Sequence, residues 1–190
     1  MQLPDDSRVL ISIDPGKQGA VVLRITGGFT PLCLRLPETC RELNNLITEL
    51  LLPKKYLPIL QDPNRTYAII ERTGTYRPGN SAVAATTFAR HCGRLEQAFI
   101  SNGIQLYSTA PQVWMSYYKD LMGIDWSTGS GDAATEKKER KHAILNSVRS
   151  KFPSNSFALW NSDAVALNIT LEHFINYSIL SRNNVCSLVQ

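Results

Sequence analysis

Short apolar runs that end in turn residues alternate along this chain with longer segments of helical spacing. Runs over 9–13, 19–24 and 29–36 are joined by short glycine-bearing connections, which predicts three antiparallel strands. Runs over 67–71 and 104–107 predict a fourth and a fifth strand. The fourth follows a helical crossover, so we expect it to pair in parallel within a central sheet.

Apolar residues at intervals of three and four predict helices between and after these strands. The helices are expected over 37–51, over 81–101, from 111, over 135–152 and from about Asn161 onward. This order predicts an α/β fold with a mixed five-stranded sheet, three antiparallel strands and then parallel ones, flanked by helices. Residues 120–134 are polar and glycine-bearing and predict a mobile loop. A chain of 190 residues is expected to form a single domain, 1–190, with its core over about 9–180.

Composition narrows the class of protein only slightly. A formal net charge of +4 permits nucleic-acid binding without requiring it. The four cysteines lack C-x-x-C spacing and histidine companions, which argues against a zinc site. The chain has no apolar run of the ~20 residues needed to span a bilayer, and its first residues are unlike a signal or transit peptide. We therefore expect an intracellular protein without a membrane partner.

Carboxylates fall at informative places in this pattern. Asp14 ends the first predicted strand and Glu71 ends the fourth, so both are expected at one edge of the sheet. Asp163 lies in the first turn of the last helix, which could lean over that edge. Three gathered carboxylates repel one another unless a cation lies between them, and such oxygen ligands suit Mg²⁺ or Mn²⁺. Two such ions, about 3.5–4 Å apart, promote phosphodiester hydrolysis.

Each carboxylate also has a purely structural interpretation. Asp14 opens an Asp-Pro-Gly sequence that is common in turns. Glu71 could simply face solvent at the end of its strand. Asp163 could complement the N-terminus of its helix, which is worth up to ~1 kcal/mol. The coincidence of two acids at strand ends favours a site.

Six segments, in this order, resemble the motifs of RuvC-like Holliday junction resolvases in their bacteriophage, viral and organellar branch. They are Ile11 to Gly16 followed by Gly19 and Ala20, Ala68 to Glu71, Gly79 to Asn102, Pro111 to Trp114, Lys137 to Pro153, and Asp163 to Leu167. The resemblance covers Val9 to about Phe174 and implies a ribonuclease-H-like fold, a homodimer and paired nicks in a four-way DNA junction. It assigns Asp14, Glu71 and Asp163 to two Mg²⁺ ions, with Mn²⁺ as a substitute, and no nucleotide cofactor is expected.

One departure from the family concerns the metal ligands. The family usually has a fourth metal-binding Asp or His three or four positions before the last acid, where this chain has Trp160 and Leu159. The oxygen of Asn161 is a candidate replacement that adds no negative charge. Asp132 and Glu136 are further substitutes if their loop folds inward.

The positions of basic residues suggest how the protein would bind DNA. Lys137, Lys138, Arg140 and Lys141 cluster at the start of a helix, and Lys119 and Arg149 could extend the track. A solvated helix face is the alternative interpretation. Arg72 and Arg77 flank the loop after Glu71. By analogy with the family, Tyr76 on that loop could stack on an unpaired base, or it could anchor its own loop.

Two rival functions remain open, and a third is disfavoured by the length of the chain. A junction-binding protein that has lost cleavage would keep the fold and the basic surface, and the missing fourth ligand favours it. A nuclease acting on other branched DNA or on RNA–DNA hybrid would have the same fold. A sugar-kinase-like or actin-like ATPase needs two such domains, for which 190 residues are too few. A resolvase would be DNA-associated, in the cytoplasm or nucleoid of a bacterial host, or in an organelle if a transit peptide has been removed.

Overall fold

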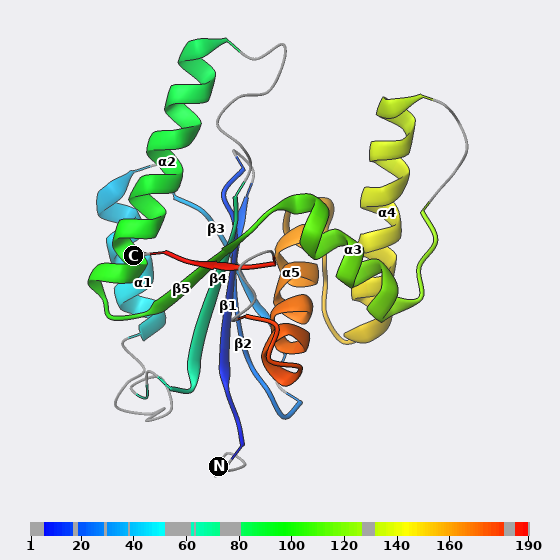
Figure 1. The fold of residues 1–190 in the computed structure, drawn as a ribbon, viewed down its shortest axis with the longest axis horizontal. Helices are drawn as coiled ribbons and strands as arrows, with labels where there is room; N and C mark the ends of the chain where they lie inside the picture. Colours follow the sequence, from blue (N-terminus) through cyan, green and yellow to red (C-terminus); the bar gives the residue numbers. More distant parts are fainter. Residues whose placement is uncertain are drawn as a thin grey trace.

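A computed structural model of the chain shows a mixed β-sheet between two layers of helices (Figure 1). It describes residues 6–16, 19–28, 30–37, 39–51, 62, 64–72, 81–126, 132–180 and 185–189. The strands are β1 (Val9–Asp14), β2 (Ala20–Ile25), β3 (Leu32–Arg35), β4 (Thr66–Glu71), β5 (Gln105–Thr109) and β6 (Ser187–Leu188). The helices are α1 (Cys40–Leu51), α2 (Ala82–Ser101), α3 (Pro111–Met122), α4 (Ala133–Lys151) and α5 (Leu159–Asn176).

The strand order is β3-β2-β1-β4-β5-β6, with β1 and β4 at the centre. β1 pairs antiparallel with β2, and β2 pairs antiparallel with β3, as the three glycine-joined runs predict. β4 is parallel to both β1 and β5, as expected for strands that follow a helical crossover. The predicted mixed α/β sheet is confirmed, with one more strand than expected. β6, of two residues, pairs antiparallel with the edge of β5 and is too short to leave a pattern in the sequence.

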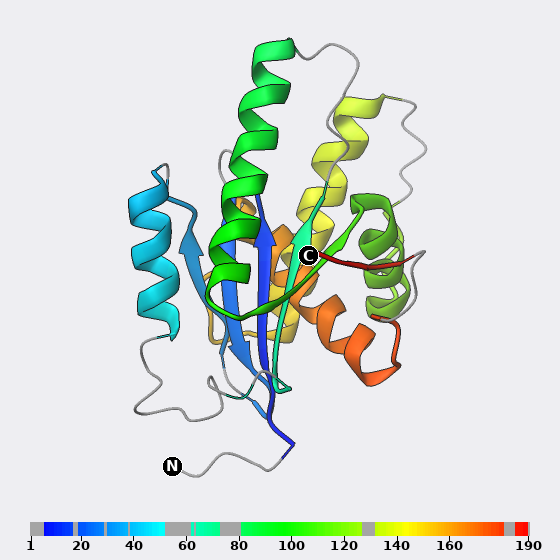
Figure 2. The same ribbon diagram turned by 60° about the vertical axis from the view of Figure 1, so that its left-hand side comes forward.

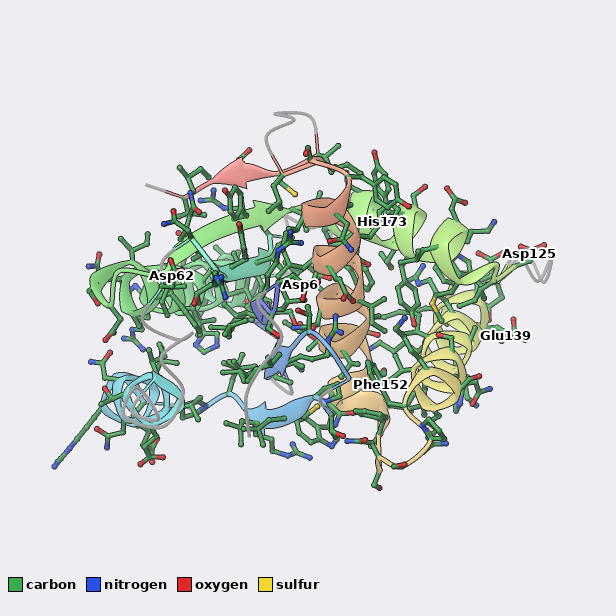
Figure 3. All side chains as sticks on the ribbon, turned by 90° about the horizontal axis from the view of Figure 1, so that it is seen from below. Asp6, Asp62, Asp125, Glu139, Phe152 and His173 are labelled. Carbon is green, nitrogen blue, oxygen red and sulfur yellow. The ribbon has the colours of Figure 1, made fainter. Side chains whose placement is uncertain are left out.

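The helices divide between the two faces of the sheet, as the views from the side and from below show (Figures 2 and 3). α1 and α2 cover one face, over an apolar cluster that includes Ile13, Ile47 and Phe99. α5 covers the other face, and α3 and α4 pack against α5. The second apolar cluster, on this side of the sheet, includes Leu10, Trp114 and Val165. In the described part of the chain, no helix is both long enough and apolar enough to cross a membrane.

Several boundaries differ from the sequence-based expectation, most of all around the last two helices. Both ends of the predicted mobile loop over 120–134 are helical: α3 continues to Met122, and α4 begins at Ala133. The middle of that loop, 127–131, lies outside the described residues. α5 begins at Leu159, before the predicted start near Asn161.

α5 is the central helix of its layer and packs directly on β1 and β2. Every residue from Asn161 to Leu171 is buried except Asp163, which is half-buried. Small side chains such as Ala164 and Ala166 allow the helix to lie close to the sheet. The hydroxyl of Ser12, fully buried on β1, donates a hydrogen bond of 2.7 Å to the carbonyl oxygen of Ala164. This bond fixes the first turns of α5 beside the end of β1.

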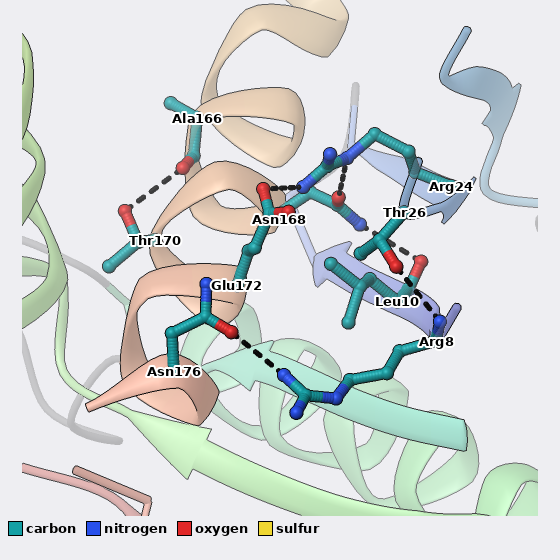
Figure 4. A network of polar contacts seen from close by, with 9 residues as sticks. All are labelled: Arg8, Leu10, Arg24, Thr26, Ala166, Asn168, Thr170, Glu172 and Asn176. Atoms are coloured by element: carbon teal, nitrogen blue, oxygen red, sulfur yellow. Dashed lines mark hydrogen bonds and ion pairs between the residues drawn. The ribbon is translucent and has the colours of Figure 1, made fainter. Parts of the chain in front are cut away.

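A buried polar network fixes the rest of α5 along the sheet (Figure 4). Arg24 on β2 donates through Nε to Oδ1 of Asn168 (2.9 Å) and through Nη2 to Glu172 (2.7 Å). Asn168 in turn donates to the carbonyl oxygen of Leu10 at 3.0 Å. The Arg24 side chain is only 6% exposed, so its charge is tolerated because these partners satisfy it. The network therefore fixes the position of α5 along β1 and β2.

The turn between β1 and β2 depends on a glycine. A Cβ atom at Gly19 would lie 1.9 Å from the carbonyl oxygen of Asp14, which is a backbone atom that cannot move aside. The amide of Gly19 also donates a hydrogen bond of 2.7 Å to the carbonyl oxygen of Gly16. Only glycine fits here, and the close approach holds Asp14 at the end of its strand.

We predict that Gly19→Ala lowers the free energy of unfolding by about 3 kcal/mol, because the added methyl forces the backbone apart. Gly93→Ala is the matched control, since Gly93 lies on the exposed side of α2 and a Cβ there meets nothing within 4 Å. That control is expected to stabilise the protein by about 0.5–1 kcal/mol. Urea denaturation measures both changes. Equal effects of the two substitutions would contradict the close approach.

Candidate active site

Two of the predicted site carboxylates end neighbouring strands at one edge of the sheet. Ile13 of β1 is in register with Ile70 of β4, so Asp14 and Glu71 follow side by side. Side chains alternate along a strand, and Ser12 contacts α5, so Asp14 points toward the same face. Glu71 points there as well, because it contacts Trp114 of α3.

Asp163 reaches this edge from the first turns of α5. Its Oδ2 forms an ion pair of 3.1 Å with the ammonium group of Lys141 on α4. Its Oδ1 is buried and has no hydrogen-bond partner within the described residues. A buried carboxylate oxygen without a hydrogen-bond donor is unfavourable, so this atom is suited to accept a ligand such as a cation.

The electrostatics of Asp14 reflect this crowding. Burial raises the pKa of its carboxyl above the ordinary value of 3.8, and the negative charge of Asp163 raises it further. A hydrogen bond of 3.0 Å from the amide of Gly16 to Oδ1 and the positive charge of Lys141 act in the opposite direction. Since burial outweighs them, the ionised form of Asp14 is destabilised and would be favoured by a further cation.

Glu71 is oriented by a tryptophan for which the sequence suggested no role. The indole Nε1 of Trp114 donates a hydrogen bond of 2.8 Å to Oε2 of Glu71. Trp114 is 1% exposed and packs edge to face on Tyr118, whose hydroxyl is 2.6 Å from the hydroxyl of Ser147. The Pro-x-x-Trp sequence at 111–114 was the available signal, because a buried indole needs an acceptor for its N–H.

The donor set suits a hard divalent cation, although the side chains are not gathered around one point. Within the described residues, no group of three or more His, Cys, Asp or Glu side chains lies close enough to hold a metal ion. Asp14 and Asp163 are near enough to interact electrostatically, whereas Glu71 is directed toward Trp114. The orphaned Oδ1 of Asp163 and the raised pKa of Asp14 are both features that a bound cation would relieve.

Of the three residues considered as a fourth metal ligand, Asn161 and Asp132 are hydrogen-bonded elsewhere. The side-chain oxygen of Asn161 accepts a hydrogen bond of 2.9 Å from the amide of Ala158 at the start of α5. Asp132 caps α4 by accepting from the amides of Ala134 and Thr135, and these bonds lower its pKa. Glu136 is exposed in the first turn of α4.

The predicted DNA-binding residues separate into two groups. Lys137 and Lys138 are exposed and Arg140 is half-buried on the part of α4 that projects beyond the sheet edge, as α2 also does (Figures 1 and 2). Four others have protein partners: Lys141 pairs with Asp163 (3.1 Å), Lys119 pairs with Asp125 (3.5 Å), Arg72 pairs with Glu96 (3.7 Å), and Arg149 donates to the carbonyl oxygen of Phe157 (2.7 Å). Tyr76 and Arg77 lie outside the described residues.

We predict that Asp14→Asn raises the melting temperature at pH 7 in metal-free buffer. The folded-state pKa of Asp14 is raised, so ionising this group destabilises the folded protein as pH rises above 3.8 and through the folded-state pKa. A neutral isostere removes that penalty, and the gain should shrink as pH falls toward 3.8. Thermal unfolding from pH 4 to 8 in EDTA measures it, with Asp6→Asn, at an exposed position, as the control. A gain independent of pH, or shared by the control, would contradict the assignment.

Similarity to known proteins is found among solved structures. No protein-family model matches the chain, and no curated protein matches it. The structure is similar to Thermus thermophilus RuvC in complex with Holliday junction substrate, at a TM-score of 0.52 and 14% identity, covering 96% of this chain and 99% of that one. A second Thermus thermophilus RuvC structure gives a TM-score of 0.52 and 15% identity over 95% of this chain and 99% of that one. The similarity over nearly the whole chain confirms that this protein has the ribonuclease-H-like fold of the RuvC structures.

Proposed function

We propose that this chain is a metal-dependent DNA endonuclease that resolves four-way junctions by paired nicks. Its fold is similar to a RuvC structure solved with Holliday junction substrate. Its strand-end acids, Asp14 and Glu71, lie where ligands bind in open α/β sheets. Fold alone does not determine function, so the proposal depends on the chemistry of this edge.

The observation that carries the proposal is the buried, unpartnered Oδ1 of Asp163 beside the destabilised carboxylate of Asp14. Asp14, Asp163 and Glu71 are the proposed ligands of Mg²⁺, with Mn²⁺ as substitute and two ions per site. A bound divalent cation would stabilise charge on the phosphate and lower the pKa of the attacking water. The hydrogen bond from Trp114 holds Glu71 in one orientation at the site.

Lys141 has a distinct part in this proposal. Its ammonium group neutralises Asp163 in the metal-free protein and lowers the pKa of Asp14. A phosphate at the site would attract the same ammonium group, so Lys141 contacts the DNA strand being cleaved. Lys137, Lys138 and Arg140, within about one helical turn of Lys141 on α4, bind the DNA backbone beyond the sheet edge.

A second copy of the chain completes the proposed enzyme, because a junction has two strands to nick and a C₂ dimer presents two sites. The projecting half of α2 offers a surface for it. Val83 is 75% exposed there, and its neighbours Ala82 and Ala84 are small and exposed. We propose that this half of α2 packs against the partner subunit.

A second candidate function is junction binding without cleavage. Lys141 already neutralises Asp163, Asn161 is hydrogen-bonded at the start of α5, and Trp160 stands where the family has a metal-binding Asp or His. These three features all weaken a metal site. Cleavage assays separate the two candidates directly.

We predict that the full chain nicks a labelled synthetic four-way junction symmetrically in Mg²⁺ or Mn²⁺ and leaves a linear duplex of the same sequence intact. Asp14→Asn and Asp163→Asn should each lower the nicking rate by about 10³-fold or more without loss of junction affinity. Asp6→Asn, at an exposed position, should have no effect. Denaturing gels measure nicking, and fluorescence anisotropy measures affinity.

The outcomes are distinct. Tight junction binding without nicking in either metal would favour the non-cleaving junction binder. Equal nicking of junction and linear duplex would favour a nuclease with another substrate. Neither binding nor nicking of a junction would contradict the proposed function.

A further inference from the structure

Arg35 lies in the same cross-strand row as the site carboxylates. It is the last residue of β3 and is in register with Ala20 of β2, which is in register with Asp14 of β1. Arg35 and Asp14 are therefore two strand spacings apart, about 10 Å between Cα atoms. Glu71 lies on the opposite side of Asp14 in this row. Arg35 thus extends the site toward the β3 edge of the sheet.

The side chain of Arg35 is stacked on an aromatic ring. Its Cζ lies 4.6 Å from the centroid of the Trp160 ring. Trp160 is half-buried in the first turn of α5, packed against the apolar core and three residues before Asp163. A guanidinium group over an indole face is held by cation–π attraction, while its N–H donors stay in the plane of the group and remain accessible.

Arg35 is exposed, and its N–H donors have no protein acceptor in the described part of the chain. Three other arginines differ in this respect. Arg24 is bound by Asn168 and Glu172, Arg72 by Glu96, and Arg149 by the carbonyl oxygen of Phe157. Arg35 is thus oriented by its stack and keeps a planar fork of donors for a ligand, which is the geometry that recognises phosphate.

We propose that Arg35, held on the face of Trp160, binds a backbone phosphate of the DNA strand that lies across the carboxylate site. This inference rests on the proposed function. The strand would then be held on both sides of Asp14, by Lys141 from α4 and by Arg35 from β3. A tryptophan stands where the resemblance places a metal-binding Asp or His, and this tryptophan orients an arginine that binds phosphate.

The stack also has an energetic consequence for binding. A free arginine side chain loses rotamer freedom when it binds a phosphate, which weakens the contact. Arg35 is already restricted by Trp160, so less freedom is lost on binding. Trp160 is therefore a positioning residue and Arg35 a binding residue.

The test is the salt dependence of DNA affinity, which reports the number of phosphates neutralised. Affinity of the full chain for a four-way junction and for a linear duplex is measured by anisotropy in EDTA between about 50 and 200 mM salt. Arg35→Ala should weaken binding by about five- to tenfold and lower the slope of log K against log salt by about 0.9. Arg35→Lys should restore the slope but only part of the affinity, because it keeps the charge without the planar fork.

Two further variants control for structure. Trp160→Leu should weaken binding while leaving the slope unchanged, because the charge of Arg35 remains. Arg41→Ala, at an exposed position on α1 across the sheet, should change neither quantity. Thermal unfolding of each variant confirms that it is folded.

An unchanged slope for Arg35→Ala would overturn the inference, while the proposed function would stand if the wild type prefers the junction. Equal affinity of the wild type for junction and duplex would count against the proposed function. The slope on either DNA would still decide whether Arg35 contacts phosphate. No affinity for DNA would overturn both.

Discussion

The hydrogen bond between the hydroxyl of Ser12 and the carbonyl oxygen of Ala164 joins the two segments on which the site depends. It is 2.7 Å long and fully buried on the β1 side. Asp14 follows Ser12 by two residues, and Asp163 immediately precedes Ala164. Because this bond and the Arg24–Asn168 network fix α5 along β1, two carboxylates from opposite ends of the sequence are held together. The stable contact between α5 and β1 therefore keeps Asp14 and Asp163 close to each other despite their mutual repulsion.

That repulsion is only partly relieved by the protein itself. Lys141 supplies one positive charge to Asp163 and lowers the pKa of Asp14, yet burial still raises the pKa of Asp14 above its ordinary value. One oxygen of Asp163 stays buried without a partner. Strain of this kind at a sheet edge is typical of sites that are completed by a ligand. The fold tolerates it because two apolar clusters, one on each face of the sheet, supply the bulk of the stability.

Local sequence patterns predicted the fold class and the placement of Asp14 and Glu71, because strand ends and side-chain alternation are local properties. The contacts that complete the site are not local. Trp114 and Glu71 are 43 residues apart, and their hydrogen bond depends on how α3, packed against α5, is placed beside the end of β4. Lys141 stood out only as one charge in a basic run, and nothing in the sequence pairs it with Asp163. The stack of Arg35 on Trp160 likewise requires β3 and α5 to be placed first.

The middle of α5 is buried on every side, so no face of it can accept amino-acid substitutions independently of its neighbours. From Asn161 to Leu171 only Asp163 escapes full burial, so most substitutions along this stretch need a compensating change in the sheet or in a neighbouring helix. The outward faces of α1, α2 and α4 carry no such restriction. Divergence in such an architecture is concentrated in its outer helices, and a common fold can then outlast most recognisable sequence identity. Within that stretch of α5, the one position that is not fully buried is the site carboxylate Asp163.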